Sequence, residues 1–226
     1  MKNIIIYTTN DKIISLNLVN HIISSHNFKS YKVDIMLNEP SLVRKLKIAL
    51  VVLFFGSITD VIRSYKKTIS IKEILKNNPN CSLVTEVNKK YDFGLSVNST
   101  KKIKVENFKI YNFHLGSLIN QRGSFIFFYK FINSWKEVFL TFHEITEKFD
   151  VGKIINERKI KFTDNCKATD IIYVYLKNLD FLTESIDLID KKTGTIYENY
   201  KKLNRVPSFK KLIKEIIEYF FNKKKN

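Results

Sequence analysis

The first half of the chain alternates between continuous apolar runs and segments that carry apolar residues at helical spacing. Residues 3–8 form an apolar run, which is typical of a strand buried on both faces of a parallel sheet. The next segment repeats apolar residues every three or four positions up to Ile23, and Asn10 and Asp11 are suited to cap it as a helix. A strand followed at once by a helix predicts a doubly wound α/β sheet.

The same alternation continues to residue 97. Three further segments are expected to be buried strands, at residues 31–37, 48–55 and 91–97. Three segments between them are expected to be helices, at residues 41–45, 59–65 and 71–76. Residues 48–55 are the most hydrophobic of these strands and end at Gly56, whereas residues 81–87 fit either state.

The second half has a different pattern. Residues 138–145 and 153–162 alternate apolar and polar side chains, which is typical of antiparallel or edge strands. Residues 147–150 are expected to form the loop between these two strands. The sheet is therefore predicted to be mixed, with a mostly parallel first part.

Two helices are expected after residue 165. Thr169 or Asp170 caps the first, which ends at Gly194, and Pro207 opens the second. The second helix carries a wide apolar stripe, made of Phe209, Leu212, Ile213, Ile216, Ile217, Phe220 and Phe221. The favoured interpretation is that this stripe packs on its own domain, with a dimer contact or a membrane-surface contact as the alternatives.

The composition is that of an ordinary folded chain with an unusual charge. Of 226 residues 44% are hydrophobic and 13% aromatic, which excludes intrinsic disorder. The net charge is +17, but only five of the 39 basic residues are arginines. Because arginine is the usual reader of nucleic acid and the lysines are scattered, the charge indicates a solvated surface with no nucleic-acid partner, while a polyanionic small substrate stays compatible with it.

Cysteine usage and hydropathy bear on where the protein works. Cys81 and Cys166 are too few for a disulfide framework or a four-ligand zinc site, and the first 20 residues do not have the pattern of a signal peptide. The longest apolar run, residues 48–55, is well short of the roughly 20 residues that cross a bilayer. We therefore expect a reduced, cytoplasmic protein without membrane insertion.

Glycine-rich nucleotide motifs are missing from the sequence. Residues 7–11, which form the first turn between strand and helix, contain no glycine, and no P-loop motif occurs anywhere. This excludes an NAD(P)-binding fingerprint and a P-loop NTPase. The turn retains hydroxyl groups and free N–H groups at a helix start, which could still hold a phosphate.

The strongest candidate for chemistry is the tripeptide from Asn112 to His114. In a strand these two side chains share one face, so an amide donor and an imidazole would converge, as an acyl-type transfer requires. Asp150 is the candidate to orient the imidazole. Taken singly, such a tripeptide is more often structural than catalytic, and an Asp before Val-Gly is more often a turn residue. His143 is expected to have a structural role, and no cluster has metal-ligand spacing.

The order of these motifs resembles that of the folate-dependent formyltransferases. Asn112-Phe113-His114 is followed by Arg122-Gly123, then by Thr141-Phe142-His143, and then by Asp150-Val151-Gly152. Several matches in the right order are more specific than any one of them. The resemblance covers residues 91–162, and the pattern before it agrees in kind.

The resemblance implies a Rossmann-like formyltransferase fold with a mixed, mostly parallel sheet, flanking helices and a short C-terminal helical appendage. Residues 1–165 would be the catalytic domain, and residues 166–226 would pack on it or form a dimer contact. The formyl donor would be 10-formyltetrahydrofolate, with no metal. By this resemblance Asn112 would bind the formyl oxygen, His114 would accept a proton from the attacking amine, and Asp150 would orient His114. The residues that would bind the folate are Leu95, Ser96, Val97, Lys102, Lys148, Phe149 and Asp150.

The family has members with different acceptors. Thr8-Thr9-Asn10 replaces the turn of the purine-pathway members, and the 64 residues after Phe162 are too few for the extra domain of methionyl-tRNA formyltransferases. The chain is therefore most similar to the sugar N-formyltransferases, which implies a nucleotide-linked amino-deoxy sugar such as dTDP-4-amino-4,6-dideoxyglucose, a role in O-antigen lipopolysaccharide biosynthesis, and a homodimer. The residues expected to bind that substrate are Thr9, Asn10, Asn120 and Arg122, while Tyr197 and Tyr200 are more readily explained by core packing than by stacking on a base. The alternatives are methionyl-tRNA, glycinamide ribonucleotide, or a basic nucleic-acid-binding module.

Overall fold

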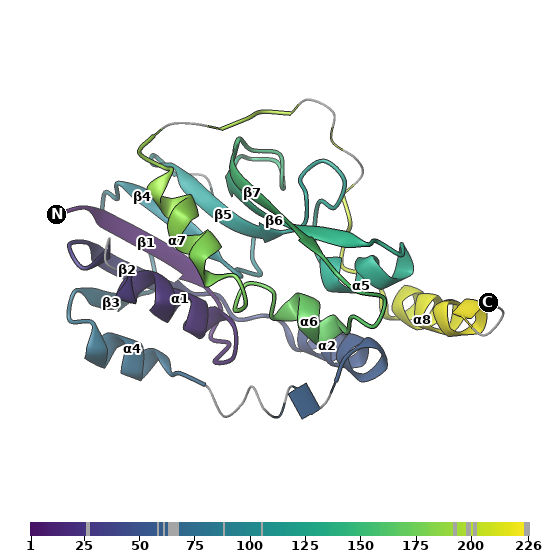
Figure 1. Ribbon diagram of the computed structural model, residues 1–226. Coiled ribbons are helices and arrows are strands. Elements are labelled where there is room, and N and C mark those ends of the chain that lie inside the picture. Colours follow the sequence, from purple (N-terminus) through teal and green to yellow (C-terminus); the bar gives the residue numbers. More distant parts are fainter. Residues whose placement is uncertain are drawn as a thin grey trace.

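A seven-stranded sheet forms the centre of the molecule (Figure 1). The computed structural model describes residues 1–25, 28–57, 59–60, 62, 68–87, 89–104, 106–191, 194–197, 200 and 203–223. The strands are β1 (Asn3–Thr8), β2 (Lys32–Leu37), β3 (Cys81–Val84), β4 (Phe93–Val97), β5 (Ile110–Leu115), β6 (Glu137–Glu144) and β7 (Ile154–Lys161). Their order is β3-β2-β1-β4-β5-β6-β7. Strands β1 to β5 are parallel, while β6 and β7 are antiparallel, so the predicted mixed and mostly parallel sheet is confirmed.

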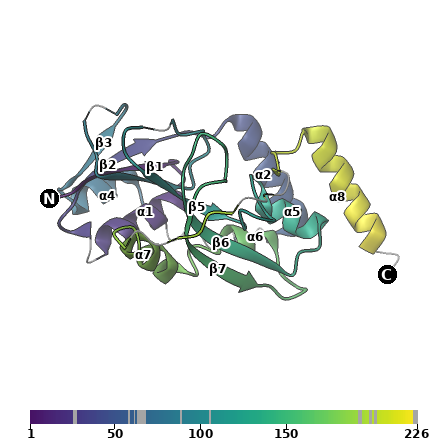
Figure 2. The ribbon, with the colours of Figure 1, turned by 90° about the horizontal axis from the view of Figure 1, so that it is seen from above.

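Helices flank this sheet, and their packing divides the core into clusters. The described helices are α1 (Ser15–Ser24), α2 (Leu42–Phe55), α4 (Ile71–Asn77), α5 (Ile126–Ile132), α6 (Ala168–Ile172), α7 (Leu179–Asp187) and α8 (Phe209–Lys223). α1 and α7 pack side by side on one face of the sheet, whereas α2, α5, α6 and α8 gather around a second cluster (Figures 1 and 2). No helix among the described residues is long and apolar enough to span a bilayer.

The period of two along the strands separates the two faces. In β1 the side chains of Ile4 and Ile6 join the large cluster under α1 and α7, while Ile5 and Tyr7 join a small cluster on the opposite face. β5 follows the same rule, because Tyr111 lies in the large cluster and Ile110 in the small one. The cluster that contains Ile5, Tyr7 and Ile110 is the smaller of the two, so polar side chains also lie on that face of the sheet.

The strand expected at residues 48–55 is a helix. α2 begins at Leu42, where the Ser41 hydroxyl accepts a hydrogen bond from the Arg44 amide, and runs on to Phe55. Its buried residues include Val51 and Phe55, which are four positions apart, and much of the rest of the helix is exposed. A short apolar run cannot by itself distinguish a strand from a helix, so the prediction was wrong, and the expected helix at residues 41–45 is the first turn of α2.

Two other predicted helices differ from the observed ones, one in its first residue and one because it is interrupted. The first helix begins at Ser15 rather than after Asp11, because Asp11 instead forms a turn in which its carboxylate accepts a hydrogen bond from the Ile13 amide. The helix predicted from residue 169 is two short helices, α6 and α7, and the Asn178 side chain donates to the Val174 carbonyl between them. Its expected end at Thr193-Gly194 falls partly outside the described residues, as does most of the helix expected at residues 59–65.

Four helix and strand predictions are confirmed closely. The helix expected at residues 71–76 is α4, which a reciprocal capping box of Ser70 and Glu73 begins. The two alternating segments of the second half are β6 and β7, paired antiparallel. The last helix, α8, follows Pro207, and its Leu212 and Ile216 are buried in the second cluster.

Candidate active site

Asn112 and His114 lie on the same face of β5. In this strand Tyr111 and Phe113 point into the cluster under α1 and α7, so the alternate side chains point to the opposite face. β5 lies between β4 and β6, which pair Asn112 with Ser96 on one side and with His143 on the other. The sheet therefore brings an amide and two imidazoles together.

Asp150 reaches these groups from the loop between β6 and β7. Its Oδ1 lies 3.8 Å from Nδ1 of His114 and 3.8 Å from Nε2 of His143. Both distances are longer than a hydrogen bond. Asp150 has a left-handed backbone with φ of 50°, and a side chain at Gly152 would collide with the Glu144 carbonyl. The tight closure of this loop sets the position of the carboxylate.

His143 is part of the site, although the sequence indicated a structural role. Its Nδ1 lies 3.0 Å from the Glu144 carbonyl oxygen, and its Nε2 lies 3.2 Å from Nδ2 of Asn112. Burial lowers the pKa of His143 from the ordinary 6.5 to about 4, so the ring is neutral near pH 7. A carbonyl can only accept, so Nδ1 carries the proton and Nε2 accepts a hydrogen bond from the Asn112 amide. Within the part of the chain that the structure describes, the second N–H of that amide has no partner.

His114 has a buried nitrogen without a partner in the structure. Its Nε2 makes no hydrogen bond, whereas its Nδ1 faces Asp150. Gly116 is needed next to it, because a Cβ there would lie 3.1 Å from Nε2 and 2.3 Å from the Gln121 carbonyl, and because its φ is 126°. A buried imidazole nitrogen that is kept clear of side chains can serve a reacting group.

A cavity of about 260 Å³ lies in front of these groups. The catalytic candidates Asn112, His114 and Asp150 all line it, together with His143. Of the residues expected to bind the folate, those that line the cavity are Ser96, Lys102, Lys148, Phe149 and Asp150. Leu95 and Val97 are fully buried in β4 and are not among its lining residues.

The residues expected to bind the second substrate lie elsewhere. Thr9 is buried, with its hydroxyl 2.6 Å from that of Ser15, while Asn10 and Asn120 are exposed. Arg122 lines a neighbouring, more open cavity of about 820 Å³ together with Tyr200. Thus none of these four side chains lines the cavity that holds Asn112 and His114.

Arg44, in the first turn of α2, also lines the cavity and was not predicted. Its guanidinium lies 5.6 Å from the ring centre of Phe125, and burial lowers its pKa. The sequence carried little signal for this residue. Its segment was expected to be a short helix leading to a strand, and nothing local pointed toward β5.

This arrangement suits the transfer of an acyl group to an amine. It offers an amide N–H to an oxygen that gains charge, an imidazole nitrogen to a proton, and a carboxylate that balances the imidazolium. The described residues contain no group of three or more His, Cys, Asp or Glu side chains that could hold a metal ion.

No protein-family model and no curated protein matches the sequence, so the comparison with known proteins depends on the fold. The N-formyltransferase from Helicobacter canadensis, solved with folinic acid and dTDP-3-aminofucose, matches with a TM-score of 0.62 and 20% identity over 100% of this chain and 82% of that chain. A 4-N formyltransferase from Francisella tularensis matches with a TM-score of 0.57 and 22% identity over 91% of this chain and 76% of that chain. This chain has the formyltransferase fold.

The formyltransferase fold also occurs within a larger protein. HypX from Aquifex aeolicus matches with a TM-score of 0.56 and 12% identity over 92% of this chain, and the match covers 30% of HypX. This chain thus spans less than a third of HypX but about four fifths of the Helicobacter canadensis enzyme. The fold predicted from the motifs between residues 91 and 162 is confirmed.

Proposed function

We propose that this protein transfers a formyl group from 10-formyltetrahydrofolate to the amino group of a nucleotide-linked amino-deoxy sugar. The observation that carries the proposal is the convergence of Asn112, His114 and Asp150 on one cavity of a formyltransferase fold. The three residues come from β5 and from a loop about 35 positions further along the chain, so their meeting is not a result of sequence proximity.

The chemistry follows from the positions of these groups. When bound, the folate would supply the formyl group, and its nitrogen would be the leaving group on the formyl carbon. The free N–H of Asn112 would donate to the formyl oxygen as that oxygen gains negative charge. His114 would take a proton from the amine whose nitrogen bonds to the formyl carbon, and would return it to the folate nitrogen as the old C–N bond breaks. Asp150 would stabilise the imidazolium between these steps.

The choice of a nucleotide-linked sugar as acceptor has separate support. The Helicobacter canadensis enzyme binds dTDP-3-aminofucose, and the cavity of this chain contains four cationic side chains and one carboxylate, which suits an anionic substrate. The cations are Arg44, Lys101, Lys102 and Lys148. Within this class we propose dTDP-4-amino-4,6-dideoxyglucose as the acceptor, and O-antigen synthesis in the cytoplasm as the setting.

We also propose that the protein is a homodimer. α2 and α8 together form an exposed apolar surface, here named the α2–α8 surface, made of Leu42, Val43, Leu46, Leu53, Phe54, Ile213, Ile217, Phe220 and Phe221. Each of these residues exposes between 38% and 71% of its area. Together they offer on the order of 800 Å² of apolar surface, which is the share of one partner in a standard interface.

A coupled binding and rate experiment tests the proposed activity. The purified protein is given 10-formyltetrahydrofolate with dTDP-, UDP- and GDP-linked amino sugars, and with tRNA and glycinamide ribonucleotide as the competing acceptors. We expect formylation of an amino sugar, and we expect His114→Ala to lower kcat by roughly 10² to 10⁴ while the affinity for 5-formyltetrahydrofolate is kept.

A matched control is His21→Ala, because His21 lies in α1, outside the cavity. This variant should retain the wild-type kcat. Formylation of tRNA or glycinamide ribonucleotide instead of any sugar would refute the sugar acceptor, and equal rates for His114→Ala and wild type would refute the mechanism. Salt-sensitive binding of DNA or RNA that survives His114→Ala, without formyl transfer, would favour the nucleic-acid-binding alternative.

A further inference from the structure

The arginines of this chain differ in how they are paired. Arg158 donates to the carboxylates of Asp180 and Glu184 at 2.7 and 2.8 Å. Arg44 and Arg122, in contrast, each have a buried Nε without a hydrogen-bond partner, and no ion pair joins either of them to a carboxylate within the part of the chain that the structure describes. A desolvated guanidinium without an anion is costly, so such a group is expected where an anionic ligand completes it.

Of these two arginines, Arg44 lies in the cavity that holds Asn112 and His114. It stacks on Phe125, which is 3% exposed and directly follows Gly123 and Ser124 of the cavity wall. This contact holds the guanidinium plane in place. The residue is therefore positioned like a binding group rather than like a solvated surface charge.

The cavity has a second set of cationic side chains, here named the Lys102–Lys148 group, and an aromatic ring holds this group as well. Lys102 lies 5.6 Å from the ring centre of Phe149, and Lys148 precedes that ring in the loop between β6 and β7. This loop follows Glu144, which pairs with Tyr111 near the start of β5. Gly123, Ser124 and Phe125, on which Arg44 stacks, come instead after the end of β5.

We propose that Arg44 binds the diphosphate of the acceptor in this cavity, while the Lys102–Lys148 group faces the folate. This inference rests on the proposed function, which needs two anionic substrates in one cavity. The planar guanidinium donates two parallel hydrogen bonds to phosphate oxygens, which a lysine cannot do. Arg44 would thus select acceptors that carry a diphosphate and would hold the sugar amine toward His114.

Binding measurements on an Arg44→Gln variant test this assignment. Isothermal titration with inorganic pyrophosphate, with dTDP, UDP and GDP, and with 5-formyltetrahydrofolate separates the two anion sources. We expect Arg44→Gln to lower the affinity for pyrophosphate by about 10- to 100-fold. The affinity for whichever nucleoside diphosphate binds the wild type should fall by the same factor. The affinity for 5-formyltetrahydrofolate should change by less than about 2-fold, and Arg44→Lys should restore only part of the diphosphate affinity.

Arg158→Gln is the matched control, because Arg158 also stacks on a phenylalanine, Phe181, but is paired with carboxylates. Arg158→Gln should leave the affinities for pyrophosphate, for the nucleoside diphosphates and for 5-formyltetrahydrofolate unchanged. Thermal unfolding of each variant checks that the variant is folded. Loss of folate affinity with diphosphate affinity intact in Arg44→Gln would overturn the assignment, as would no change in either. If the wild type binds pyrophosphate but no folate, the proposed function fails, while the comparison of Arg44→Gln with wild type still decides whether Arg44 binds diphosphate.

Discussion

Single residues in this site depend on one another through protonation. His143 orients the Asn112 amide only while its Nε2 is free of a proton, because a protonated ring would donate at that position instead of accepting. The Asn112 amide, whose N–H is proposed to donate to the formyl oxygen, is therefore oriented by a histidine that must stay neutral. The low pKa of His143, about 4, secures this across the physiological range.

The same residue makes folding stability depend on pH. The unfolded chain binds a proton at His143 near its ordinary pKa of 6.5, whereas the folded chain does so only near 4. Stability is therefore fully present above pH 6.5 and falls as the pH drops from 6.5 toward 4. We expect this residue alone to cost about 2 kcal/mol between pH 7 and pH 5. Urea unfolding of wild type and His143→Gln at both pH values measures the difference.

Removal of the titrating ring is the control in that experiment. His143→Gln retains an acceptor for the Asn112 amide but has no group that titrates between pH 7 and pH 5. Its stability should change with pH by about 2 kcal/mol less than that of the wild type. Parallel pH profiles for the two proteins would contradict the low pKa of His143.

The sequence predicted those candidate site residues that belong to a recognisable motif. Asn112 and His114 were found because period two in a strand puts them on one face, and Asp150 because it completes the chemistry. His143 was placed on an alternating strand but without its register, and only the pairing with Asn112 shows its role. Arg44 reaches the cavity through tertiary packing on Phe125, which no local pattern contains.

Among the secondary elements, α2 shows the limit of pattern reading most clearly. Its run of Val, Leu, Ile and Phe has the composition of a buried strand, and the chain does contain such strands in β1 and β4. The difference is in the environment, since β1 and β4 are enclosed on both faces while α2 leaves much of its surface exposed. The apolar composition predicted burial correctly for β1 and β4. It failed for α2, where many of the apolar side chains are exposed to solvent.

The exposed apolar residues of α2 and α8 lead to a prediction about association. The two helices lie next to each other at one end of the molecule (Figure 2). A groove on them is lined by Leu50, Phe54, Ile213, Ile216, Ile217, Phe220 and Phe221, which are all apolar. We expect the wild type to be a dimer and Ile217→Lys to be a monomer, because a buried lysine without a partner would be costly. Light scattering after size exclusion gives the mass of each.

Ile196→Lys is the control for that substitution. Ile196 is also exposed but lies outside α2 and α8, so its replacement should leave the mass unchanged. A monomeric wild type at concentrations of tens of micromolar, or a dimer that Ile217→Lys does not alter, would refute the homodimer through the α2–α8 surface.

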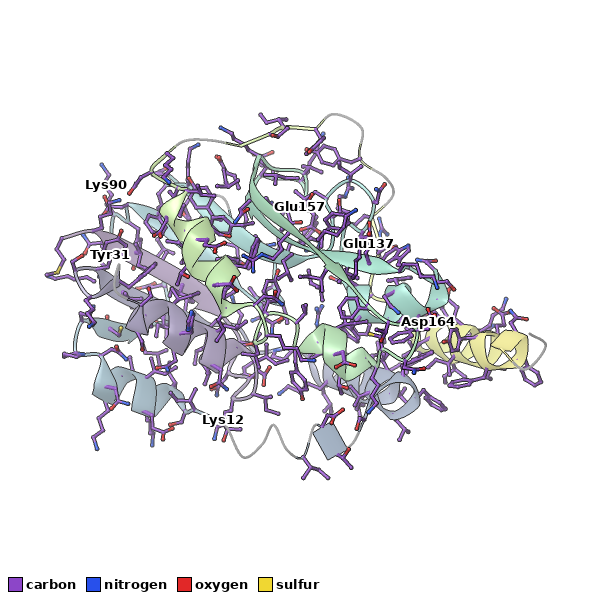
Figure 3. The ribbon with its side chains drawn as sticks, viewed as in Figure 1. Lys12, Tyr31, Lys90, Glu137, Glu157 and Asp164 are labelled. Atoms are coloured by element: carbon purple, nitrogen blue, oxygen red, sulfur yellow. The ribbon has the colours of Figure 1, made fainter. Side chains whose placement is uncertain are left out.

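The whole molecule carries its positive charge on many sides. Lysines such as Lys12 and Lys90 lie far apart on the surface, whereas acidic residues such as Glu137 and Glu157 lie on β6 and β7 (Figure 3). The net charge of +17 nevertheless acts on any anion that approaches the cavity.

This charge makes substrate capture sensitive to salt. We expect the KM for a nucleotide-linked amino sugar to rise several-fold between about 50 and 300 mM NaCl. The reason is that salt screens the electrostatic attraction between the positively charged protein and the anionic substrate. The value of kcat should stay nearly constant, since the groups proposed to act on the formyl carbon are buried or half-buried. Steady-state kinetics over this range, with a neutral osmolyte as the control, provide the measurement. A KM that is independent of salt would show that the net charge plays no part in capture.

The chain order of the site has an implication for evolution and for engineering. The segment from Ile110 to Gly152 supplies every group proposed to act on the formyl carbon, whereas Arg44 belongs to a helix that precedes it by more than 50 residues. On these two proposals, transfer chemistry and acceptor preference are encoded in separate stretches of the gene. Exchange of the start of α2 between relatives offers a route to new acceptors that leaves the reaction itself untouched.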